Sequence, residues 1–294
     1  MKLFFSTVFW ILTITAISSA QTTLYYPQIA NGQQGGGISW VTWILITNSG
    51  TSPTSGSILF TQDNGTPFNI SFFDADTGNQ PGGSGNIILF QLEVGQTRIY
   101  LSSGAGPLTV GFGTLSSGSR VTSTAVFSEY GFGGGPGAPG GLSGGLIAEA
   151  SVPAVTASMR QATFFYVADK FDSAVALVNT GASTADITLQ ILDGNGAVIA
   201  PPVAITLPAN NHTAKYVSQL FPSAVGHDGT MQIISSMPLA GVALRFSSSG
   251  AFTTLPVFLA SLLNPAWEWL DQRPWLTPLH SLAKLLKGSP FTIG

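Results

Sequence analysis

The sequence predicts an all-β protein built from two β-sandwiches in tandem. Turn-forming residues are abundant, with 35 Gly and 18 Pro among 294 residues. The runs between the turns are mostly short and rich in Val, Ile, Thr, Phe and Tyr, as strands are. Hydrophobic residues make up 44% of the chain, which is enough for a sizeable core. The same landmarks recur in the same order in both halves of the chain, which predicts the tandem arrangement.

The chain begins with a segment, residues 1–20, that matches a secretory signal peptide. Lys2 is its only charged residue, an apolar stretch covers residues 3–17, and small residues occupy positions 18–20. A membrane anchor is the alternative, but a span takes about 20 packed apolar residues and no basic flank follows this stretch. We expect cleavage before Gln21 and a mature chain that is secreted, extracellular or on the cell surface, without a transmembrane span.

The internal similarity rests on strands and turns at corresponding places. An apolar strand ends in an Asn-x-Gly turn at Asn48 and again at Asn179. Asn and Gly suit such turns because they tolerate a positive φ. The matched landmarks are the strands 44–48 and 175–179, the strands 57–61 and 187–192, the turns 63–65 and 193–196, the loops 92–96 and 207–211, the Ser-Ser pairs 116–117 and 235–236, and Phe127 with Phe246.

The apolar pattern of single strands predicts how they are covered. Residues 120–127 alternate between apolar and polar, as a half-buried strand does. Residues 87–92 and 174–178 are more continuously apolar, so we expect central strands that are covered on both faces. Short strands with turns every 8–12 residues are typical of a β-sandwich.

The predicted organisation is a signal peptide (1–20), a first sandwich (21–155), a second sandwich (161–260) and a Trp-rich tail (261–294). Residues 131–145 are almost all Gly, Pro, Ala and Ser and are expected to form an insertion in the first sandwich, since glycine's backbone freedom is costly to fix.

The segment Tyr26-Pro27-Gln28-Ile29-Ala30-Asn31-Gly32, followed by Trp40 and the strand 44–48, resembles uncharacterised secreted bacterial proteins with tandem immunoglobulin-like β-sandwich repeats. The second-half run 205–210, with 220–222 and 229–230, is similar to the same group. The resemblance covers about residues 24–258. It implies immunoglobulin-like sandwiches outside the cell and carries over no functional residue.

Composition and motifs exclude several kinds of chemistry. The chain has no Cys, which excludes disulfides, Cys-ligated metals and thiol catalysis. The net charge of -3 gives no field that attracts nucleic acid. The three His are not closely spaced, and no serine-hydrolase elbow or phosphate-binding loop is present. We therefore predict no enzyme and no catalytic, cofactor-binding or metal-binding residue, while the scattered acids leave a hydrolase as an open alternative.

Asp74 and Asp76 are the best metal candidates. Oxygen ligands at alternating positions in a turn suit Ca²⁺. Gly78 stands where a third acidic ligand is usual, and no Glu closes the loop. The alternative is a solvated Asx turn, in which the carboxylate accepts nearby backbone N–H groups.

Trp40 and Trp43 could provide an aromatic surface for a sugar, since rings stack on apolar ligand faces. They lie three apart, so in a strand they point to opposite faces. The alternative is packing in the core.

The tail contains further tryptophans and an expected short amphipathic helix. Trp267, Trp269 and Trp275 precede residues 278–287, whose Leu279, Leu282 and Leu286 form one stripe. Docking or membrane-interface contact is one interpretation, and packing against the second sandwich is the other.

We therefore expect a non-catalytic secreted or cell-surface structural or adhesive protein. The alternative is an extracellular carbohydrate-binding protein that uses exposed aromatic residues. The expected partner is an extracellular polysaccharide or another surface protein, with no cofactor and no nucleic acid.

Overall fold

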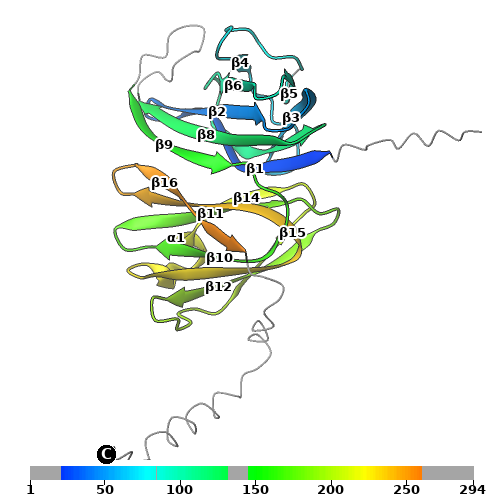
Figure 1. The fold of residues 1–294 in the computed structure, drawn as a ribbon. Helices are drawn as coiled ribbons and strands as arrows, with labels where there is room; N and C mark the ends of the chain where they lie inside the picture. The colour runs from blue at the N-terminus through cyan, green and yellow to red at the C-terminus, as the bar shows by residue number, and fades with distance from the viewer. Residues whose placement is uncertain (1–20, 84, 132–144, 260–294) are drawn as a thin grey trace, which may run out of the picture.

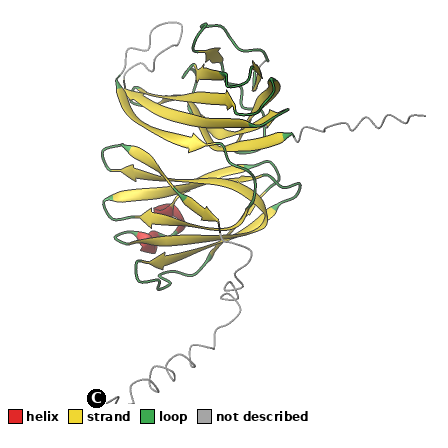
Figure 2. Cartoon of the chain, viewed as in Figure 1, coloured by secondary structure: helices red, strands yellow, loops and turns green. Residues whose placement is uncertain are grey.

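The computed structural model describes residues 21–83, 85–131 and 145–259, and these form a nearly all-β, sandwich-like structure (Figure 1). The prediction of an all-β fold is confirmed: strands dominate Figure 2, with two short helical turns. The expected signal peptide, nearly all of the Gly-rich insertion and the tail with its expected helix lie outside the described residues.

The N-terminal half consists of antiparallel strands β1–β9. One row of strands has the order β1-β7-β3-β5, and the other has the order β4-β6-β2-β8-β9. The end of β1 also pairs with the beginning of β2. The bounds are β1 Thr22–Gln34, β2 Ile38–Asn48, β3 Thr54–Gln62, β4 Phe72–Asp74, β5 Ile87–Leu92, β6 Thr97–Ser102, β7 Thr109–Ser117, β8 Val121–Gly131 and β9 Leu146–Pro153.

The C-terminal half repeats this order of strands. β10-β15-β12-β13 corresponds to β1-β7-β3-β5, and β14-β11-β15-β16 corresponds to β6-β2-β8-β9. One long strand, β15, takes part in both rows. The bounds are β10 Met159–Val167, β11 Phe171–Asn179, β12 Ala185–Asp193, β13 Val203–Leu207, β14 His212–Tyr216, α1 Val217–Leu220, η1 Pro222–Ala224, β15 Asp228–Ser247, β16 Phe252–Leu255 and β17 Val257–Leu259.

The two Asn-x-Gly turns have the same hydrogen bonds. The Asn48 side chain donates to the carbonyls of Ser52 (2.9 Å) and Leu92 (3.2 Å) and accepts from the N–H of Gly50 (2.9 Å). The Asn179 side chain donates to Ser183 (2.8 Å) and Leu207 (2.8 Å) and accepts from Gly181 (2.9 Å). Both side chains are buried, so these bonds satisfy groups that water does not reach.

The register shifts two of the expected matches by one residue. Ser117 lies opposite Gly56, and Ser235 lies opposite Ile187, so the pair 116–117 corresponds to 234–235. The other match is Phe127 with Phe246. Val121 lies opposite Asn48, and Leu239 lies opposite Asn179. Counting six residues onward from each, the residue that corresponds to Phe127 is Arg245 rather than Phe246. A shift of one residue turns a strand side chain to the other face, so Phe127 and Phe246 are not equivalent.

The predicted burial of strands is right for two of the three segments. In β8, Val121, Ala125 and Phe127 are buried, as the alternating pattern predicts, and β11 is buried almost throughout. The prediction for residues 87–92 is wrong. β5 is an edge strand in which every second residue is exposed, because only one of its faces meets the core.

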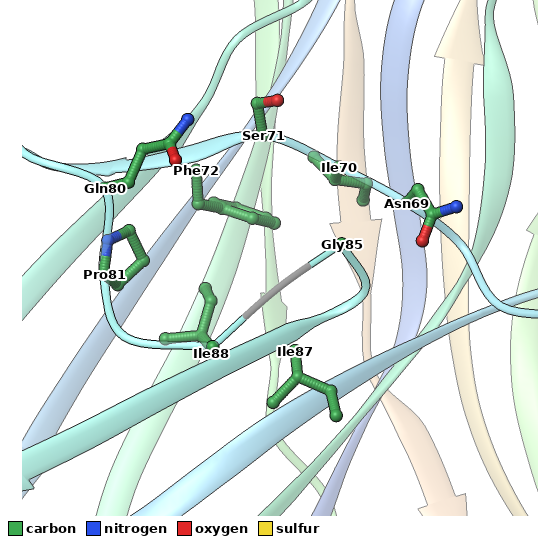
Figure 3. A pocket seen from close by; sticks show the side chains of 10 residues that line it. Asn69, Ile70, Ser71, Phe72, Gln80, Pro81, Gly85, Ile87 and Ile88 are labelled. Atoms are coloured by element: carbon green, nitrogen blue, oxygen red, sulfur yellow. The ribbon is translucent and has the colours of Figure 1, made fainter.

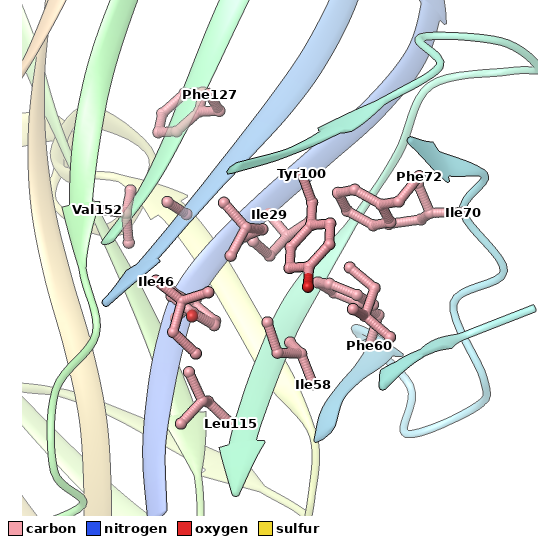
Figure 4. Packing of buried hydrophobic residues seen from close by; sticks show 14 of the residues in the cluster. Ile29, Ile46, Ile58, Phe60, Ile70, Phe72, Tyr100, Leu115, Phe127 and Val152 are labelled. Atoms are coloured by element: carbon pink, nitrogen blue, oxygen red, sulfur yellow. The ribbon is translucent and has the colours of Figure 1, made fainter. Parts of the chain in front are cut away.

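The core of the N-terminal half lies between its two rows of strands (Figure 4). Phe60 stacks on Phe72 with 4.8 Å between ring centroids. Ile46, Ile58 and Leu115 are fully buried near them. Full burial of such side chains contributes about 1.5–3 kcal/mol each, which makes this core a main source of stability.

The two halves share one apolar cluster where they meet. Residues 154–158 connect β9 to β10, and β1 and β9 face β11 and β16 across the boundary (Figure 1). We call the following residues the junction cluster: Trp40, Phe127, Ala148 and Ala150 from the N-terminal half, and Ala176, Val242, Leu244, Phe246 and Phe252 from the C-terminal half. Phe252 lies 5.0 Å from Phe127 between ring centroids, so the stack crosses the boundary.

Candidate binding groove

A groove of about 750 Å³ lies at one end of the N-terminal half. Gly56 and Phe90, which are cross-strand neighbours on β3 and β5, contribute one side. Asp74, Arg98 and Tyr100 from β4 and β6 contribute the other. Residues 79–82, from the connection between β4 and β5, complete the lining. The groove is therefore built from the ends of both rows of strands.

Gly56 leaves the space that the Phe90 ring occupies. A Cβ atom at position 56 would lie 2.5 Å from Phe90 Cζ and 2.2 Å from the carbonyl oxygen of Ser116. Such contacts are far below van der Waals distance. Any side chain at position 56 would clash with the Phe90 ring and with the backbone of β7, so this position requires glycine.

The Asp74 carboxylate is engaged by its own turn and by Arg98. Asp74 Oδ1 accepts the backbone N–H groups of Asp76 and Thr77, each at 3.0 Å. Asp74 Oδ2 lies 3.4 Å from Arg98 Nη1, and Asp76 Oδ2 lies 3.9 Å from the same nitrogen. This geometry is the Asx turn considered as the alternative to a Ca²⁺ site. In the described ranges, no group of three or more metal-binding side chains comes together around it.

Tyr100 adds a neutral hydroxyl to this charged pair. Burial, together with the negative charge of Asp74, raises the pKa of Tyr100 to about 12, although Arg98 acts in the opposite direction. The phenol is therefore protonated at physiological pH and can both donate and accept a hydrogen bond.

A smaller pocket of about 150 Å³ adjoins the groove (Figure 3). Gln80 and Pro81 line both spaces. The apolar side chains of Ile70, Phe72 and Ile88 lie on the other sides of the small pocket. Both spaces depend on the long connection between β3 and β5.

Trp40 and Trp43, considered above as an aromatic surface for a sugar, do not line the groove. Trp40 stacks on Phe127 and Phe252, with centroids 5.9 and 5.5 Å apart, and its Nε1 donates to Gln34 Oε1. Trp43 packs against a separate cluster that includes Tyr130. They lie in different clusters, as residues three apart in a strand should, and their role in the structure is packing.

The structure pairs His212 with Asp63 of the other half. His212 Nδ1 lies 2.7 Å from Asp63 Oδ1, and the His212 N–H donates to the Asp63 carbonyl at 3.0 Å. The imidazole is fully buried and stacks on Phe112. Because 149 residues separate the pair, no local sequence pattern could have indicated it.

The comparisons with known proteins give little guidance. No family model matches the chain, and no curated protein matches it in sequence. A solved lectin from Pleurotus ostreatus, in complex with GalNAc, is similar at a TM-score of 0.23 and 12% identity, over 82% of this chain and 86% of that one. A likeness this low supports no conclusion about fold or ligand. No helix in the described part of the chain is long and apolar enough to cross a membrane.

Proposed function

We propose that this chain is a non-catalytic secreted or cell-surface protein with a structural or adhesive role. In this proposal, two immunoglobulin-like sandwiches in tandem act as one rigid body that presents a binding surface. The junction cluster is the observation that carries the proposal.

Domains within a chain usually move relative to one another unless the interface between them is large and apolar. Here five apolar residues of the C-terminal half belong to the same cluster as the core of the N-terminal half. A second apolar contact joins Phe112 to Val178 and Ala240. The Asp63–His212 pair adds a polar contact at the boundary. These three contacts favour a fixed arrangement of the two halves. A fixed arrangement suits a structural or adhesive protein.

The tandem arrangement is supported by two features. The order of strands is the same in both halves, and Asn48 and Asn179 make the same set of bonds. Location outside the cell is supported by residues 1–20, which match a secretory signal peptide.

Carbohydrate binding is the second candidate function. The polar groove favours this function. Trp40 and Trp43 do not support it, because both pack against apolar clusters.

Fractionation of the cells that make the protein tests the proposal. We expect the exported chain to begin at Gln21, and beads coated with the purified chain to adhere to the surface of those cells. An intact Met1 on soluble cytoplasmic protein would contradict export. Beads that adhere no better than beads coated with the Phe252→Ala variant would contradict the role of a rigid junction.

A further inference from the structure

We infer that the groove between β3, β5, β4 and β6 binds a neutral glycan. This inference deepens the proposed function and rests on it, because an adhesive protein needs a site that contacts its partner.

The charges around the groove do not favour an anionic ligand. Its charged lining residues are Asp74 and Arg98, whose side chains lie 3.4 Å apart. Asp76 Oδ2 lies 3.9 Å from the same Arg98 nitrogen, so two carboxylates face the one guanidinium and leave no positive charge to attract an anion. Both lining side chains still have polar atoms that can bind hydroxyl groups, since Arg has five N–H donors and a carboxylate has several acceptor sites.

The remaining polar side chains suit hydroxyl groups. Asn79, Gln80 and Gln91 line the groove, and within the described ranges their amide groups make no hydrogen bond to another protein group. An amide offers a donor and an acceptor side by side. A sugar ring presents neighbouring hydroxyls that donate and accept in the same way, so each amide can bind a pair of them.

The groove also has apolar surface. Pro81 and Leu89 are among its lining residues, and Leu89 is 52% exposed. The C–H face of a sugar ring is apolar and gains from contact with such side chains. The volume of about 750 Å³ falls within the usual range for ligand sites, about 300–1,000 Å³.

A peptide that adds a strand to the sheet fits this place less well. β5 is the edge of its row, but the Leu89 N–H already donates to the Gly82 carbonyl at 2.7 Å. The edge is therefore paired at Leu89, and a peptide would have to displace Gly82 to add a strand there.

Binding of neutral oligosaccharides to the full mature chain tests the inference. The probes are cellohexaose, xylohexaose and chitohexaose, and the method is isothermal titration calorimetry. We expect one of them to bind with a Kd of about 1 mM or lower. Arg98→Ala should weaken that binding about tenfold, because the guanidinium donors are lost. Gln91→Ala should weaken it as well.

Thr213→Ala is the matched control, because Thr213 occupies the position in β14 that Arg98 occupies in β6. It should leave binding unchanged. Melting temperatures close to that of the natural chain would show that the variants are folded. The inference is overturned if no probe binds, or if Arg98→Ala and Gln91→Ala both bind as well as the natural chain. Beads coated with Arg98→Ala that still adhere to cells would leave the proposed function standing while the groove inference fails.

Discussion

The two halves of the molecule have the same order of strands but differ in how the strands are connected. In the N-terminal half, β3 ends at Gln62 and β5 begins at Ile87, and the connection contains β4 and lines the groove. In the C-terminal half, β12 ends at Asp193 and β13 begins at Val203. The comparison shows how one framework can be varied, because the long connection adds lining to the candidate groove and the short one joins its strands directly.

The positions that line the groove differ between the halves as well. Ile187 occupies the position of Gly56, and Lys215 that of Tyr100. Ile187 is 1% exposed and belongs to the core of its half. α1 adds Val217 to the same core, η1 adds Ala224, and Phe221 between them is part of it too. The C-terminal half therefore supports the molecule, while the N-terminal half carries the candidate site.

Two aromatic residues of the C-terminal half, Tyr216 and Phe246, lie outside the core cluster of that half and contact each other, with centroids 5.2 Å apart. In the strand register, Tyr100 corresponds to Lys215 and Phe127 corresponds to Arg245, so each of these two rings is one position further along its strand. Because side chains alternate along a strand, this shift turns both rings away from the core of their own half, and Phe246 packs against the other residues of the junction cluster.

Phe252→Ala should have the largest effect, because it removes the ring at the centre of the junction. Phe252 is 7% exposed and stacks on Trp40, Phe127 and Phe246. Replacing a buried Phe with Ala costs about 3–5 kcal/mol. We expect a loss of that size in urea unfolding, together with separate transitions for the two halves.

Phe258→Ala is the control, since Phe258 is 50% exposed and belongs to neither core cluster. It should change stability by less than about 1 kcal/mol. If Phe252→Ala behaves like this control, the halves are not joined by the junction cluster.

Asn48→Ala and Asn179→Ala should destabilise the chain by similar amounts. Each removes three hydrogen bonds and leaves buried backbone groups without a partner. The expected loss is roughly 2–3 kcal/mol for each variant, measured by thermal unfolding. A large loss of stability for one variant and none for the other would contradict the equivalence of the two turns.

Alkaline pH should affect the N-terminal half through Tyr100. Its pKa is raised from 10.0 to about 12, so between these values the folded chain keeps a proton that the unfolded chain loses. The stability from this group is therefore complete below pH 10 and is lost as pH rises toward 12. Tyr100→Phe should lose less stability over this interval than the natural chain, by about 1–2 kcal/mol. Equal losses would show that Tyr100 does not titrate as described.

The smallest effect concerns the loops that follow the edge strands. Gly95 (φ 74°) and Asn210 (φ 56°) are both left-handed, and their N–H groups donate to the carbonyls of Asn48 and Asn179. Gly95→Asn and Asn210→Gly should each change stability by no more than about 0.5 kcal/mol, since both residues tolerate this conformation. Gly95→Val is the strained control and should cost more than either.

The sequence predicted features that depend on local patterns and missed those that depend on long-range packing. The turns at Asn48 and Asn179 and the alternation of β8 follow from short-range rules. The edge position of β5 does not, because an apolar run reads the same in a central strand and an edge strand.

The sequence analysis matched residues of the two halves by the similarity of short segments. This matched Phe246 with Phe127, one residue away from the position that the strand register gives. The site could be predicted only in part. The Asp74 turn was visible in the sequence, but Arg98 and Tyr100 join it only through the pairing of β4 with β6.

The central claim is that the N-terminal half holds the binding site and the C-terminal half supports it. Hydrogen–deuterium exchange of the full mature chain, with and without saturating oligosaccharide from the probe set, tests this most directly. We predict protection confined to residues 74–82, 89–91 and 98–100. Protection at the corresponding residues 204–206 and 213–215 instead, or no change in either half, would contradict the account.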